Sequence, residues 1–144
     1  MENVFQYLNT DLDLASATDL RPLAAELEAR GFLLLDVHQQ SDGNWYARFE
    51  ADEQHNEPET NIAAMLTVIE TLADEFLQVW QGCTSREFNV GYECGAEPWA
   101  FNQALSCETL ERMAAAAATL RITLYPHHPS EASIQCTIDE SLDE

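Results

Sequence analysis

The sequence predicts an α+β fold in which a mostly antiparallel sheet carries helices packed on one of its faces. Two patterns support this prediction. Segments with apolar residues at helical spacings of three or four alternate along the chain with shorter runs in which apolar and polar residues alternate, as in half-buried strands. The segments follow the order β-α-β-β-α-β-α-β-β. The first six match the split βαβ arrangement of ferredoxin-like folds, extended by an additional αββ unit.

A strand and a helix are predicted first. Asp11 to Ala15 alternates acids with apolar residues, which indicates a short strand with one solvated face. Thr18 or Asp19 can cap a helix that ends at Gly31. Its apolar stripe consists of Leu20, Leu23 and Leu27, and a pair of opposite charges four positions apart is formed by Glu26 and Arg30.

A hairpin and a long helix are predicted next. Two runs typical of strands, Phe32 to Gln39 and Trp45 to Ala51, flank a turn at residues 41–44. Five of the ten residues from Glu50 to Glu59 are acidic, which predicts a solvated loop. One helix is then expected from Thr60 or Asn61 to about Trp80. Its apolar face contains Ile62, Met65, Leu66, Ile69, Leu72, Phe76 and Trp80.

The remaining elements are a strand, a helix and two more strands. The strand contains Phe88, Val90 and Tyr92, and an irregular segment extends from Gly91 to Leu105. Ser106 is expected to cap a helix, with Glu108 paired to Arg112. Residues expected to face inward from this helix are Leu110, Met113, Ala114, Ala117 and Leu120. The last two strands are predicted at Arg121 to Tyr125 and Ile134 to Ile138.

The chain of 144 residues is predicted to form a single domain, with an acidic tail at residues 139–144. Twenty-six acids oppose six arginines and no lysine, which gives a formal net charge of −20. The absence of lysine excludes a Schiff-base lysine and a phosphate-loop lysine. Nucleic acid and anionic membranes would be repelled, whereas a basic protein would be attracted. Solubility, or adaptation of a whole proteome to salt, would give the same composition.

The cellular compartment is predicted to be the cytoplasm. Met1 to Thr10 lacks the basic start and apolar run of a signal peptide, and no segment has the roughly 20 apolar residues of a membrane span. In that compartment cysteines are expected to stay reduced. We therefore predict free thiols at Cys83, Cys94, Cys107 and Cys136.

No motif predicts a catalytic site, a metal site or a cofactor. No two cysteines are closer than eleven positions, so no CxxC pair exists for zinc. His127 and His128 are adjacent after a proline, which is typical of a polar turn, and the loop at residues 50–59 lacks the spacing of a calcium loop. Neither GxSxG nor GxGxxG occurs. We therefore favour a protein without catalytic activity and without a cofactor.

The irregular segment contains the candidate binding residues, which are Tyr92, Cys94, Glu97, Trp99 and Phe101. Aromatic side chains surrounded by charge suit a protein-binding patch. Long connections also tuck aromatic rings over the open end of a core, and we favour this interpretation for Trp99 and Phe101. Cys94 lies between acids that would raise rather than lower a thiol pKa, which disfavours a nucleophile.

Three segments carry a resemblance: the stretch from Arg86 to Tyr92, the stretch from Glu97 to Asn102, and the stretch from Leu120 to Pro126. Together they resemble a family of small uncharacterised bacterial proteins. The resemblance covers roughly residues 4–126 and implies a bacterial cytoplasmic setting. It implies no chemistry and assigns no functional residue.

Two functional hypotheses follow from the sequence. The first is a non-catalytic protein-interaction module, comparable to an immunity or inhibitor protein, whose acidic face docks a basic partner. The alternative is a small-molecule-binding protein or an unrecognised enzyme, with a pocket between the sheet and residues 91–105 lined by Tyr92, Cys94, Glu97 and Trp99.

Overall fold

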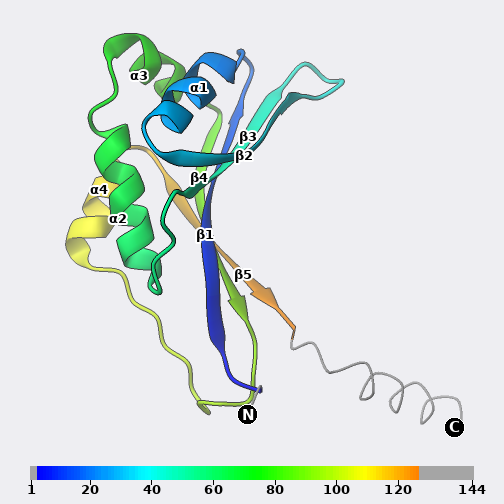
Figure 1. Ribbon diagram of the computed structural model, residues 1–144, viewed down its shortest axis with the longest axis vertical. Coiled ribbons are helices and arrows are strands. Elements are labelled where there is room, and N and C mark those ends of the chain that lie inside the picture. Colours follow the sequence, from blue (N-terminus) through cyan, green and yellow to red (C-terminus); the bar gives the residue numbers. More distant parts are fainter. Residues whose placement is uncertain (1–2, 127–144) are drawn as a thin grey trace, which may run out of the picture.

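A computed structural model describes residues 3–126 of the chain. In this part the fold is α+β, with four helices and a five-stranded, mostly antiparallel open sheet (Figure 1). The strands are β1 (Gln6–Ser16), β2 (Phe32–Gln39), β3 (Trp45–Ala51), β4 (Ser85–Glu93) and β5 (Thr119–Tyr125). The helices are α1 (Arg21–Ala29), α2 (Pro58–Ile69), α3 (Asp74–Gln81) and α4 (Cys107–Ala115).

The sheet has the order β2-β3-β1-β4-β5, with β1 in the centre. β1 pairs antiparallel with both β3 and β4, and β2 pairs antiparallel with β3. β5 joins the far edge parallel to β4. The helices lie on one side of this sheet, and no described element covers its other face (Figure 1).

The core lies between the helices and the covered face of the sheet. Along β1, the alternate residues from Thr10 to Ser16 are buried, while the intervening residues are only partly buried. This period of two is what a strand with one covered face requires. The largest buried apolar side chains come from both layers and include Leu12, Phe49, Phe88, Leu20, Leu23, Leu27, Ile62, Met65, Leu66 and Trp80.

The single helix predicted from residue 60 to residue 80 is wrong, because the chain breaks it after Ile69. Thr71 and Leu72 donate backbone bonds to residues three positions earlier, which tightens the end of α2, and the Thr71 hydroxyl also binds the Thr67 carbonyl at 3.2 Å. Ala73 is extended before α3 begins. The break lets α3 turn toward α1 while Leu72 and Trp80 stay buried. The apolar spacing continues through the break, so periodicity alone does not reveal it.

Smaller differences concern helix ends and charged pairs. Ser106 caps α4 as predicted, since its hydroxyl accepts from the Thr109 amide at 3.1 Å. Of the residues predicted to face inward from this helix, only Met113 is buried: Leu110, Ala114 and Ala117 are exposed, and Leu120 is an exposed residue of β5. Arg112 pairs at 2.8 Å with Glu70, the residue that follows α2, rather than with Glu108. α1 begins at Arg21, two residues after the predicted cap Asp19. The predicted pair of Glu26 with Arg30 is present at 3.8 Å.

The predictions for His127, His128, the strand at residues 134–138 and the tail at residues 139–144 lie outside the described residues. The strands predicted between residues 11 and 125 are all present, and β1 and β4 are longer than predicted.

A buried asparagine ties the acidic loop before α2 to the central strand. Asn61 is fully buried, and its Nδ2 donates to the Tyr7 hydroxyl at 2.7 Å and to Gln54 Oε1 at 3.0 Å. Its Oδ1 accepts from the His55 amide at 2.8 Å. These bonds hold the loop in one position, because the Asn61 amide is shielded from water and would otherwise be left without hydrogen-bond partners.

We expect Asn61→Ala to lower the free energy of unfolding by about 2–3 kcal/mol, because the hydrogen bonds of the buried amide are lost and its space in the core is left empty. Urea unfolding followed by circular dichroism measures this change. Thr60→Ala is the matched control, since Thr60 is exposed on the same turn of α2. Equal stability of the two variants would contradict the role assigned to Asn61.

Candidate functional site

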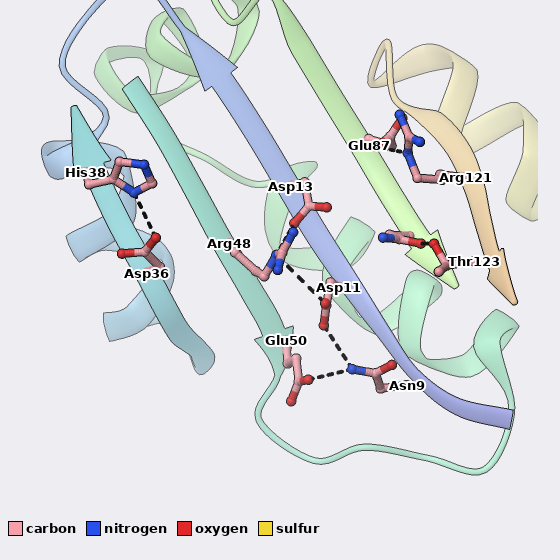
Figure 2. A network of polar contacts seen from close by, with 11 residues as sticks. Asn9, Asp11, Asp13, Asp36, His38, Arg48, Glu50, Glu87, Arg121 and Thr123 are labelled. Atoms are coloured by element: carbon pink, nitrogen blue, oxygen red, sulfur yellow. Dashed lines mark hydrogen bonds and ion pairs between the residues drawn. The ribbon is translucent and has the colours of Figure 1, made fainter. Parts of the chain in front are cut away.

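The uncovered face of the sheet is polar, and its charged residues come from all five strands (Figure 2). They face away from the helices because they alternate with the core residues of the same strands. A broad depression of about 660 Å³ runs across this face. Its lining includes Asp13, Asp36, His38, Tyr46, Arg48, Glu87, Arg121 and Tyr125.

Both arginines of this face are already paired with carboxylates. Arg48 Nε lies 2.8 Å from Asp13 and 3.9 Å from Asp11, and Arg121 Nε lies 2.7 Å from Glu87 (Figure 2). Because the arginines are more than half exposed, each pair contributes little to stability. Their positive charge is nevertheless matched within the chain. Among the described residues of this face, Glu50 has no arginine partner, and Asp11 has only the longer contact with Arg48.

Asp11 and Glu50 form the most crowded part of the face. The pairing of β1 with β3 places these two acids directly opposite each other. Asn9 Nδ2 bridges them, at 2.8 Å from Glu50 and 3.2 Å from Asp11 (Figure 2). Like charges at such positions repel, and Asp11 is only 16% exposed. Burial, together with the nearby Glu50, raises the pKa of Asp11 to about 7.

The crowded carboxylates favour a positive charge at this position. The folded chain supplies one amide bridge from Asn9 and a distant arginine at 3.9 Å. A proton or an incoming cation would each relieve the repulsion, because either removes the cost of holding two negative charges together. The arrangement is therefore suited to binding a cationic side chain from another molecule.

His38 extends the polar face toward the edge strand β2. Its Nδ1 lies 2.8 Å from Asp36 Oδ2 (Figure 2). Its ring stacks on Tyr46 with centroids 5.9 Å apart. These groups border the 660 Å³ depression. They add aromatic contact area beside the carboxylates, which is a combination that suits a guanidinium group.

A second surface lies on the helix side of the sheet, next to β5. A groove of about 320 Å³ separates β4 and β5 from the segment at residues 101–105. Its lining is mostly apolar and consists of Phe5, Pro58, Val90, Tyr92, Phe101, Asn102, Gln103, Leu105, Leu120, Ile122 and Leu124. The aliphatic side chains of β5 are 41% exposed at Leu120, 57% at Ile122 and 59% at Leu124. The described elements therefore leave this strand largely uncovered.

The chain after β4 is anchored at the amino-terminal end of β1. The Phe5 amide donates to the Glu97 carbonyl at 2.8 Å. Gly95 packs so closely on Val4 that a Cβ would come within 2.4 Å of its backbone. Only glycine fits this contact, because any larger residue would push the two segments apart. This anchor fixes one end of the wall of the groove.

The structure separates the five predicted binding residues. Tyr92 and Phe101 line the groove with ring centroids 5.3 Å apart, and Phe101 also stacks on Phe5. Cys94, Glu97 and Trp99 do not line it. The interpretation as a core cover therefore holds for Phe101 and is wrong for Trp99, which is 96% exposed. Aromatic character alone does not show which ring reaches the core.

The polar face was not among the candidate sites predicted from the sequence. Alternation around Asp11 and around Arg48 did predict that these side chains face solvent. The juxtaposition of Asp11 with Glu50 depends on the register between strands 39 positions apart, and no local pattern encodes that register.

Other chemistry is sparse in residues 3–126. Cys83, Cys94 and Cys107 are free thiols, as predicted, and Cys136 lies outside this range. Burial raises the pKa of Cys83 to about 11, which disfavours its thiolate. No group of three or more histidines, cysteines or acids in this range could hold a metal ion. None of its helices has the length and apolar character needed to cross a membrane.

Comparisons with known proteins give no further guidance. No family model, no curated protein and no solved structure matches the chain. Any assignment of function therefore depends on the geometry of the two surfaces.

Asp11→Asn should stabilise the protein at pH 8 by about 1–2 kcal/mol, after allowance for solvent screening of a site at the surface. Asp11 has a folded pKa of about 7, above the 3.8 of an unperturbed aspartate, so the folded state binds the proton more tightly. The cost of ionised Asp11 is full above pH 7 and disappears as the pH falls toward 4.

Urea unfolding at several pH values between 4 and 8 measures this effect. The stabilising effect of Asp11→Asn should shrink steadily as the pH falls. Asp52→Asn, in the exposed loop before α2, removes the same charge and should show no such trend. A gain that did not depend on pH would rule out the repulsion described for Asp11.

Proposed function

We propose that the protein is a non-catalytic interaction domain that docks a basic partner on the open polar face of its sheet, in the manner of an immunity or inhibitor protein. The observation that carries this proposal is the crowding of Asp11 and Glu50 on a face whose two arginines are already paired. The folded chain keeps carboxylates together at a cost that a cation from outside would remove.

An arginine or lysine of the partner would occupy the space next to Asp11 and Glu50. Its charge would replace the proton that Asp11 holds near neutral pH, so binding would release a proton. Tyr46 and His38, stacked on each other, border the depression on the same face and would offer an aromatic surface to a second guanidinium group of the partner, beside Asp13 and Asp36 rather than beside Asp11 and Glu50. The net charge of −20 would steer a basic partner toward the domain and raise the association rate at low salt.

We also propose that β1 to β4, with the helices between them, form a ferredoxin-like split βαβ unit. The order β2-β3-β1-β4 and the antiparallel pairing of all three neighbouring pairs support this assignment. In this description α4 and β5 are an extension of the unit.

Binding of a labelled arginine-rich peptide provides the test, with fluorescence anisotropy at low salt as the measurement. Asp11→Asn/Glu50→Gln should weaken binding by about tenfold or more, because the unpaired carboxylates are removed. The control Asp52→Asn/Glu53→Gln removes the same number of negative charges, but from an exposed loop. It should bind the peptide within about twofold of the unmodified protein. Equal losses in the two variants would show attraction to net charge only and would refute the site.

The same titration has a pH dependence that belongs to Asp11. Between pH 6 and pH 8 the affinity of the parent chain should rise by up to about tenfold, because ionised Asp11 is the binding form. Asp11→Asn should remove this rise. A rise that persists in the variant would assign the titrating group elsewhere.

A second candidate function is the binding of a small apolar ligand in the groove next to β5. The 320 Å³ volume and the rings of Tyr92 and Phe101 in its wall support this alternative. An apolar fluorescent dye such as an anilinonaphthalene sulfonate would test it. Phe101→Ala, which opens the wall, should change dye binding severalfold, whereas Trp99→Ala should not, since Trp99 lies outside the groove. Equal responses would count against the groove.

A further inference from the structure

Within residues 3–126, β5 is an edge strand whose outer backbone groups bond to no other strand. It pairs only with β4 among the strands of the described chain. The Tyr125 carbonyl accepts from the Cys94 amide at 2.8 Å, so Tyr125 directs its backbone groups toward β4. Because this direction alternates along a strand, the N–H and C=O groups of Leu120, Ile122 and Leu124 point to the free edge. Such an edge is a ready template for another strand.

The same edge is the least acidic part of the molecule. The longest stretch of the chain without an Asp or Glu runs from Arg112 to Ser130 and contains all of β5. Edge strands are usually protected from pairing by charged side chains. β5 instead exposes Leu120, Ile122 and Leu124 beside an apolar groove. Two copies with a net charge of −20 each would repel each other least if they met along this strand.

The sequence of β5 is complementary to itself when two copies run antiparallel about Ile122. In that register Ile122 faces Ile122 of the second copy, Leu120 faces Leu124, and Arg121 faces Thr123. The outward-directed backbone groups of the three aliphatic residues then bond to one another. A register centred on Arg121 would also satisfy the backbone, but it would place two arginines directly opposite each other, which is unfavourable.

We propose that the protein forms a homodimer through antiparallel pairing of β5 with β5 of a second copy, with the two-fold axis at Ile122. The two sheets become one continuous sheet, and the apolar side chains of the two β5 strands form one strip on its helix side. The two open polar faces then lie side by side on the opposite surface. This dimer does not depend on the basic partner proposed above.

Sedimentation equilibrium of the full chain and of residue 122 variants tests the proposal. Ile122→Lys and Ile122→Glu should each raise the dimer dissociation constant by about 100-fold or more, because each places like charges across the two-fold axis. An equimolar mixture of these two variants should restore the dimer, since lysine then faces glutamate. Leu33→Lys on the other edge strand, where Leu33 is 47% exposed, is the matched control and should leave the dimer intact.

Three results would overturn the dimer. One is a full chain that stays monomeric at high micromolar concentration. If removal of residues 127–144 then allowed two copies to pair, those residues would be the occupant of the β5 edge in the full chain, in place of a second copy. Another is a dimer that Ile122→Lys leaves unchanged while its circular dichroism shows a folded chain. The last is a mixture of lysine and glutamate variants that stays monomeric, which would exclude contact between equivalent residues.

Salt separates this proposal from the binding of a basic partner. Added salt should strengthen the dimer, because it screens the repulsion between two acidic copies. It should weaken binding of the arginine-rich peptide, because it screens an attraction. A dimer that dissociates as salt is added would contradict pairing through an acid-free edge, whatever the peptide does.

Discussion

β1 pairs along most of its length with both β3 and β4, and the position of every other strand follows from these two ladders. Its alternation sends Leu12 and Leu14 into the core and Asp11 and Asp13 to the open face. A slip by one residue would exchange the two sets and bury carboxylates against α2. Burying a charge costs far more than exposing a leucine, so the register is strongly determined. The core and the polar face are therefore consequences of one pairing.

The same pairing causes the electrostatic repulsion between Asp11 and Glu50 on the open face. A register chosen by the core leaves the residues of the other face no freedom of position, so Asp11 meets Glu50 regardless of their charges. The chain relieves this contact with an amide from Asn9 and with a longer contact from Arg48, 3.9 Å from Asp11. In a protein without lysine, whose two arginines on this face are bound to Asp13 and Glu87, the missing positive charge has to come from a proton or from another molecule.

The two exposed surfaces of the sheet differ in the forces they can use. The polar face presents charge, which reaches about 10 Å at moderate salt and would give fast association with a basic partner. The β5 edge presents backbone hydrogen-bonding groups and apolar side chains, which act only at close contact. The cause of this division is the placement of the helices. α1 packs on β2, and α2 packs on β1 and β3, so the aliphatic side chains of β5 stay largely exposed.

Local patterns in the sequence were sufficient for the α+β class, for the central part of each described strand and for the cap at Ser106, because alternation, helical spacing and capping act within a few residues. The break between α2 and α3, the exposure of Trp99 and the pairing of Arg112 with Glu70 were decided by packing between elements distant in sequence. The candidate site belongs to this second group. The alternation of apolar and acidic residues around Asp11 predicts that its side chain faces solvent. Its crowding with Glu50 arises only when β1 and β3 pair, because register is a property of two strands and not of either one.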